Sequence, residues 1–127
     1  MAYQTTVDLN ALEGKSIYKN QRGEHQCVAL VQAVTAAVPT SQWKRGIRVL
    51  DAKPGDIPVG TVIATFDADG KYPLTARHAA IYVAHNDAGI EVYDQWVKQK
   101  MVKKRTLRLK NLPIRDVNDA KYYYVVE

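Results

Sequence analysis

The amino-acid sequence predicts an α+β fold in which one N-terminal helix packs on a small antiparallel β-sheet. Only Glu24 to Val38 has apolar residues at helical spacing over several turns. The later segments are short, rich in β-branched residues and separated by turn sequences, which is typical of consecutive antiparallel strands. The length of 127 residues and the apolar content of 46% fit one domain spanning residues 1–127.

The expected elements follow in order along the chain. Residues 1–23 are irregular apart from a turn of helix near Leu9–Glu13, and the main helix ends before Pro39, whose ring cannot continue it. The clearest hairpin turns at Asn86–Gly89, a run of typical turn residues. The expected extended segments are Ile47–Leu50, Thr61–Phe66, His78–Ala84, Ile90–Trp96, Lys104–Leu109 and Tyr122–Val126.

The formal net charge is +5, and much of the excess lies between Lys98 and Lys110. Such a segment is either a polyanion-binding surface or an edge strand whose lysines prevent pairing with other sheets. Nucleic acid is not an expected partner, because no interleaved aromatic residues or nucleic-acid-binding motif are present. No apolar run is long enough to cross a bilayer, so membrane insertion is not expected. The N-terminus lacks the features of a Sec signal, which predicts synthesis in the cytoplasm without a signal peptide.

Cys27 is the only cysteine, and it lies at the N-terminal edge of the apolar stripe of the predicted helix. The first turn of a helix presents unpaired N–H groups and a partial positive charge, and both favour the thiolate. Cys27 is therefore either a small core residue or an activated nucleophile.

A cysteine nucleophile needs a base, and the base needs a group that orients it. Of the three histidines, His25 lies nearly half a turn around the helix from Cys27, and His85 lies at the exposed tip of the hairpin. His78 begins a strand and is followed by two alanines, whose small side chains allow a helix to approach closely. The sequence therefore favours His78 as the base.

The choice of orienting residue depends on the number of residues in the hairpin loop. Because side chains alternate along a strand, an even loop places Gln95 on the face of His78, whereas an odd loop places Asp94 there. The turn sequence Asn86–Gly89 favours a type I turn closed by a left-handed glycine, which adds a bulge and makes the count odd. A five-residue loop sets Asp94 opposite Ala80, diagonal to His78. Asp94 is therefore preferred to Gln95.

A site of Cys27, His78 and Asp94 needs no metal or organic cofactor, because water can release an acyl-cysteine. The backbone N–H of Cys27 would stabilise the oxyanion, with Gln21 or Tyr18 as a second donor. Basic residues would hold anionic groups of a substrate. The substrate-binding candidates are Arg77, Gln95 and Trp96, together with the basic residues around Lys103–Arg105.

Three segments carry a family resemblance: Gly23–Gln32, Arg77–Val83 and Ile90–Trp96. Their order resembles that of the papain-like NlpC/P60 and CHAP peptidoglycan amidases, in which a cysteine opens a helix, a histidine opens a strand and a polar residue lies on the next strand. The glycine-led strand within Pro58–Phe66 is similar as well. The resemblance implies a papain-like α+β core in which Cys27, His78 and Asp94 are catalytic. It is greatest to the amidase effectors of type VI secretion, and it suggests the third of their families.

That resemblance implies several further properties. The protein would be secreted by a type VI system into the periplasm of a target cell, and a cognate immunity protein would block its active site. It would cleave an amide of peptidoglycan, either the D-alanyl–diaminopimelate crosslink or the γ-D-glutamyl–diaminopimelate bond of the stem. The alternatives are a non-catalytic module that binds cell wall or another polyanion, and another cysteine protease or acyl transferase on the same fold.

Overall fold

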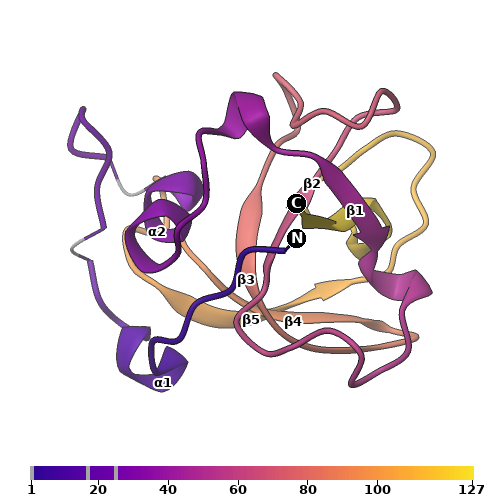
Figure 1. Ribbon diagram of the computed structural model, residues 1–127, viewed down its shortest axis with the longest axis horizontal. Coiled ribbons are helices and arrows are strands. Elements are labelled where there is room, and N and C mark those ends of the chain that lie inside the picture. Colours follow the sequence, from indigo (N-terminus) through magenta and orange to yellow (C-terminus); the bar gives the residue numbers. More distant parts are fainter. Residues whose placement is uncertain (1, 17, 25) are drawn as a thin grey trace.

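The computed structural model of the chain describes residues 2–16, 18–24 and 26–127. Within these residues six strands form one antiparallel sheet in the order β1-β6-β2-β3-β4-β5, and α2 lies beside one of its faces (Figure 1). The α+β prediction is confirmed. The helices are α1 (Leu9–Leu12), α2 (Cys27–Val34) and three 3₁₀ helices, η1 (Thr40–Gln42), η2 (Val49–Asp51) and η3 (Ala120–Tyr122). The strands are β1 (Arg45–Arg48), β2 (Val62–Thr65), β3 (Ala79–Asn86), β4 (Gly89–Asp94), β5 (Lys103–Arg108) and β6 (Tyr123–Val126).

Helix α2 is shorter than the sequence predicts at both ends. Its last residue is Val34, because Thr35 adopts an extended conformation (φ −134°, ψ 173°) and its hydroxyl donates to the carbonyl of Val31 at 2.8 Å. A threonine hydroxyl at this position competes with backbone N–H groups for a carbonyl of the preceding helical turn. The helix therefore ends well before Pro39, and it begins at Cys27 itself.

The two faces of the sheet carry separate apolar cores. Leu30 and Val31 of α2 are fully buried against one face, and α2 packs chiefly on β3. The two alanines that begin β3 are also fully buried, and their small side chains are what a close helix–sheet contact requires. The opposite face is covered by residues of η2 and η3, among them Val49 and Ala120. The N-terminus of α2 is thereby fixed beside the beginning of β3.

The β3–β4 hairpin differs from the predicted hairpin in the position of its extra residue. Asn86 pairs with Gly89, so the turn has two residues and not five. The register shifts further along, between the pairs Tyr82–Val92 and Ala84–Glu91, where β3 has one residue more than β4. Continuing the register beyond this bulge sets Asp94 opposite Ala80, as predicted. The register is thus the one that the sequence predicts, but the bulge that causes it lies within the strand and not in the turn.

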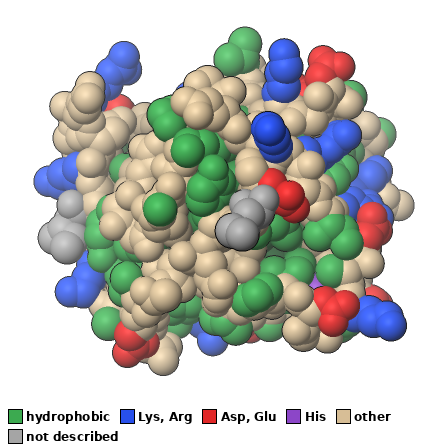
Figure 2. All heavy atoms as spheres, viewed as in Figure 1, with side chains coloured by type: hydrophobic (Ala, Val, Ile, Leu, Met, Phe, Trp, Pro, Cys, Tyr) green, Lys and Arg blue, Asp and Glu red, His purple; other side chains and the backbone are tan. Residues whose placement is uncertain are grey.

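The basic segment lies on and around β5, which is an edge strand of the sheet. Lys104 forms a salt bridge of 2.9 Å with Glu91, and Arg105 binds Asp94, so part of this charge is neutralised within the protein. On the face shown in Figure 2, most basic side chains lie towards the rim, and apolar and uncharged groups make up much of the surface between them. None of the helices formed by the described residues has the length and apolar character needed to span a bilayer.

Candidate active site

A cleft of about 430 Å³ lies where the N-terminus of α2 meets the start of β3 and the segment after β4. It brings together Cys27, His78, Arg77 and Trp96, four of the residues singled out from the sequence. Its lining residues are Gln26, Cys27, Val28, Thr40, Tyr72, Arg77, His78, Trp96 and Val97. The nucleophile and base candidates therefore share one solvent-accessible cavity, with a cation and an aromatic ring on its wall.

His78 and Asp94 form a direct, buried hydrogen bond. The Nε2–H group of His78 donates to Oδ2 of Asp94 at 2.7 Å, and Asp94 is fully buried. This bond occupies Nε2, so Nδ1 is the ring nitrogen left to interact with Cys27. The predicted contact between His78 and Asp94 is confirmed.

The backbone of His78 is held by Thr65 of β2. The Thr65 hydroxyl accepts a hydrogen bond from the His78 N–H at 3.0 Å and donates to the carbonyl of Ala76 at 3.3 Å. Ala76 has a positive φ of 49°, a conformation that a non-glycine residue adopts only where neighbouring contacts hold it. Fully buried Thr65 therefore fixes the point at which the chain turns His78 towards the cleft.

Burial and three neighbouring groups determine the ionisation of Cys27. Burial raises the pKa of the thiol, but a hydrogen bond to His78 and the positive charge of that ring lower it, as do the N–H of Ala79 and the hydroxyl of Tyr72. The net pKa lies below the ordinary value. The Tyr72 hydroxyl lies 3.9 Å from Sγ, and burial raises the pKa of this hydroxyl, which keeps it protonated as a donor.

The pKa of His78 shifts in the opposite direction, above its ordinary value. Burial lowers its pKa, but hydrogen bonds to Asp94 and Cys27 and the negative charges of both raise it to about 9. A lowered thiol pKa and a raised imidazole pKa both favour transfer of the proton from Cys27 to His78. The two groups are therefore arranged as a thiolate–imidazolium pair requires, and that pair is the reactive form of a cysteine nucleophile.

This ion pair predicts that iodoacetamide alkylates Cys27 about tenfold faster in the wild type than in His78→Ala near pH 6. In the wild type the rate should vary little from mildly acidic to neutral pH, because the thiolate is already formed. In the variant the rate should rise steeply towards the pKa of an ordinary thiol. Intact-mass kinetics across this range measure both. A wild-type rate that climbs as steeply as that of a free thiol would contradict the ion pair.

Three sequence-predicted residues lie elsewhere. Gln95 is fully buried and donates to the carbonyls of Tyr18 at 2.7 Å and Gln26 at 2.9 Å, so its expected contact with substrate is corrected. The carbonyl of Tyr18 is thereby tied to β4, and the Tyr18 side chain packs on the core and does not line the cleft. Gln21 is exposed and lines a separate hollow on the outer side of α2. His25 lies outside the described residues.

Two residues of the site were missed or misassigned in the sequence. Arg105, grouped there with substrate-binding cations, donates through Nε to Oδ2 of Asp94 at 2.7 Å. Arg105 lies two residues before the apolar Leu107, so both side chains must lie on the same face of β5. This spacing was a signal that Arg105 faces the protein interior. Tyr72 has no such signal, since it lies in an irregular loop that only the folded chain brings to Cys27.

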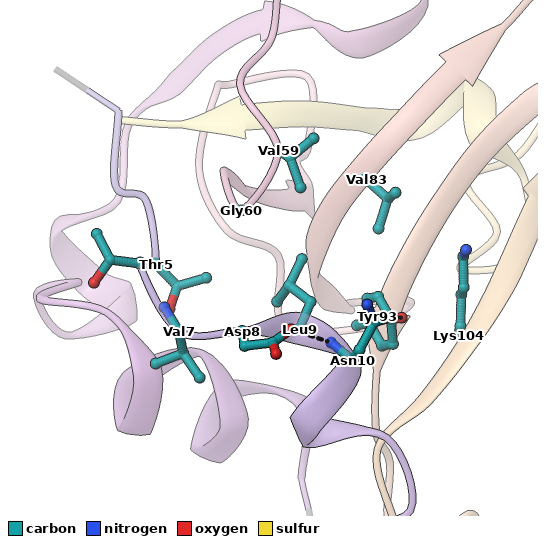
Figure 3. A pocket seen from close by; sticks show the side chains of 11 residues that line it. Thr5, Val7, Asp8, Leu9, Asn10, Val59, Gly60, Val83, Tyr93 and Lys104 are labelled. Carbon is teal, nitrogen blue, oxygen red and sulfur yellow. Dashed lines mark hydrogen bonds between the residues drawn. The ribbon is translucent and has the colours of Figure 1, made fainter.

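Another hollow, of about 480 Å³, lies between the N-terminal segment and the sheet (Figure 3). Its polar groups include Asp8, Asn10 and Lys104, and the Tyr93 hydroxyl donates to Asn10 at 2.9 Å. Among the described residues that line it, none is a cysteine or histidine, so it lacks the nucleophile and base found in the Cys27 cleft. No group of three potential metal-ligating side chains (His, Cys, Asp or Glu) is found in the described part of the chain.

A helix that presents a cysteine to a histidine at the start of an antiparallel strand is the arrangement of the papain-like fold. The family model described as domesticated amidase effector 2 matches residues 3–126. The chain belongs to this amidase effector 2 family.

Relatives of known name agree with this assignment. The "Type VI secretion amidase effector 2 protein" of Salmonella typhi is 38% identical over 116 residues, which cover 81% of this chain and 85% of that protein. The "Domesticated amidase effector 2" of Ixodes scapularis is 37% identical over 103 residues, covering 79% and 70%. A solved structure of type 6 secretion amidase effector 2 (Tae2) matches with a TM-score of 0.81 at 33% identity, covering 97% of this chain and 93% of that one.

These findings confirm the resemblance to type VI secretion amidase effectors. They also correct one detail, since the matching family is the second of these effectors and not the third. The third family was suggested by a short, basic chain without a Sec signal, and these properties are not specific to one effector family. The match over residues 3–126 uses the whole chain and therefore separates the families.

Proposed function

We propose that residues 1–127 form a single papain-like amidase domain that cleaves an amide of peptidoglycan through a cysteine nucleophile. The observation that carries the proposal is the sequence of contacts from Cys27 to His78 and from His78 to buried Asp94. Membership of an amidase effector family supports the reaction class. The names of the bacterial relatives support delivery by type VI secretion.

In this mechanism the Cys27 thiolate attacks the carbonyl carbon of the amide, and a thioester replaces the C–N bond. The imidazolium of His78 gives its proton to the leaving amine. Neutral His78 then takes a proton from water, whose oxygen attacks the thioester, and the carboxylic acid product leaves as the thiolate is restored. Asp94 holds the ring in the tautomer and orientation that both steps require.

The negative charge that develops on the carbonyl oxygen needs donors close to the sulfur. The backbone N–H of Cys27 lies at the N-terminus of α2, where it is not used within the helix. The Tyr72 hydroxyl, beside Sγ, is a second donor that replaces the earlier candidates Gln21 and Tyr18. Both donors belong to the lining of the cleft.

The walls of the cleft suit an anionic peptide. Exposed Arg77, with its guanidinium 5.7 Å from the centre of the Tyr72 ring, can pair with a stem carboxylate, and Trp96 adds an apolar surface to the lining. The bond cleaved is then either the D-alanyl–diaminopimelate crosslink or the γ-D-glutamyl–diaminopimelate bond. The site of action is the periplasm of the target cell, and a cognate immunity protein covers this cleft in the producing cell.

Mass spectrometry of digested sacculi tests the proposal and identifies the bond. Purified protein should convert crosslinked muropeptides to monomers if it cleaves the crosslink. If it cleaves the stem, it should leave stems that end at D-glutamate and release peptides that begin with diaminopimelate. The same digestion with heat-denatured protein is the control. Intact muropeptides after prolonged incubation, together with retention of the protein on sacculi, would instead indicate a binding module.

A further inference from the structure

Arg105 contacts two members of the site although it lies on the edge strand β5. Its Nε donates to Oδ2 of Asp94 at 2.7 Å, the same oxygen that accepts from His78 at the same distance. Its guanidinium carbon lies 4.6 Å from the centre of the Trp96 ring, over its face. Trp96 in turn meets the His78 ring edge-on at 6.3 Å between centroids. The side chains of Asp94, Arg105, Trp96 and His78 thus form a closed ring of contacts.

The carboxylate of Asp94 depends on this ring. Oδ1 is buried and has no hydrogen-bond partner among the described residues, so both bonds to its side chain use Oδ2. If Arg105 were removed, His78 alone would hold a buried carboxylate that is free to rotate. A buried charge with one partner is also poorly compensated.

We propose that Arg105 is a positioning residue that holds Asp94 and Trp96 in place around His78 and moderates the basicity of the imidazole. This rests on the proposed function, because it assigns Arg105 a role in the same reaction. The guanidinium neutralises part of the charge that Asp94 directs at His78, and it lies near enough to disfavour the imidazolium. The stacked contact also fixes Trp96 at the wall of the cleft.

The groups that determine the titration of His78 come from every element around it. On the negative side they are the Cys27 thiolate and Asp94. The cations nearby are Arg105, which binds Asp94, and Arg77, which lines the same cleft. Tyr72 and Tyr123 are also close, but burial raises the pKa of each hydroxyl, so both stay neutral. Removal of Arg105 takes away the arginine that binds Asp94, while Arg77 stays at the wall of the cleft. The imidazolium should then persist to higher pH.

The test compares Arg105→Met, Arg105→Lys and the matched control Arg108→Met, an exposed position on the same strand. Two quantities are measured: the pH profile of kcat/KM on muropeptides and the titration of His78 by NMR. In Arg105→Met, kcat/KM at neutral pH should fall about 10- to 100-fold, and the His78 midpoint and the alkaline limb should rise by about one pH unit. Arg105→Lys should keep the wild-type midpoint and recover part of the rate. Arg108→Met should behave as wild type.

A positioning role is overturned if the His78 midpoint in Arg105→Met stays at its wild-type value or falls. It is also overturned if only the melting temperature drops, since a purely structural role would lower stability without moving the titration. The NMR measurement needs no substrate. If wild-type protein cleaves no muropeptide, the proposed function fails while the NMR titration still decides the role of Arg105.

Discussion

Replacing Cys27 with alanine should abolish amide hydrolysis, lowering kcat by about 10⁶-fold, the scale expected when an activated nucleophile is removed. His78→Ala should cost a similar factor, because the thiolate loses the cation that stabilises it and the leaving amine loses its proton donor. The two losses should not add, since both residues act in one step. Each variant is incubated with muropeptides at one pH near neutrality, and chromatography of the released products measures its rate of hydrolysis.

The control is Gln32→Ala, an exposed position on the same helix, which should retain wild-type activity. Circular dichroism should show that Cys27→Ala is folded, because only a partly buried sulfur is removed. Full retention of hydrolysis in Cys27→Ala would end the proposed mechanism, and the amidase activity of the family would then need another nucleophile.

The second large effect is expected for Asp94→Asn, which should lower kcat/KM by about 10³- to 10⁴-fold. Asparagine has nearly the shape of aspartate, but it carries no charge and cannot stabilise the imidazolium. The alkaline limb of the profile, near pH 9 for the wild type, should therefore move to lower pH. This shift is opposite in sign to that expected for Arg105→Met. A pH profile of kcat/KM from mildly acidic to alkaline conditions measures it.

Gln95→Met is the matched control for Asp94→Asn, because the two residues are adjacent and equally buried. It should lower the free energy of unfolding by about 2 kcal/mol, since the carbonyls of Tyr18 and Gln26 each lose a donor. The alkaline limb should stay in place. If Gln95→Met reduced kcat/KM more than Asp94→Asn, the assignment of the orienting residue would be wrong.

Much of the site could be predicted because the chemistry follows from local pattern. A cysteine at the first apolar position of a helix and a histidine at the head of a β-branched run need only periodicity to be placed. Alternation along β4 then leaves two candidates, Asp94 and Gln95, for the third position. The structure brings Asp94 to His78 and turns Gln95 towards the chain before Cys27.

The remainder depended on tertiary structure. The bulge in β3 leaves no mark in the sequence, because the turn residues at Asn86–Gly89 suit several loop lengths. The end of α2 was overestimated, since the Thr35 hydroxyl and not Pro39 terminates it. Arg105 was read as part of a basic surface, because charge counts do not show which cation a buried carboxylate recruits. Each error concerns a contact between residues far apart in the chain or a side chain that competes with the backbone.

Asp94 and Gln95 are consecutive residues, yet their side chains hold different halves of the site. One holds the ring of His78, and the other holds the backbone at Gln26, immediately before the cysteine. Two adjacent residues at the end of β4 therefore connect the chain before the nucleophile to the base. Because the two contacts come from adjacent residues, local opening of this short segment would loosen the hold on His78 and on the chain before Cys27 together.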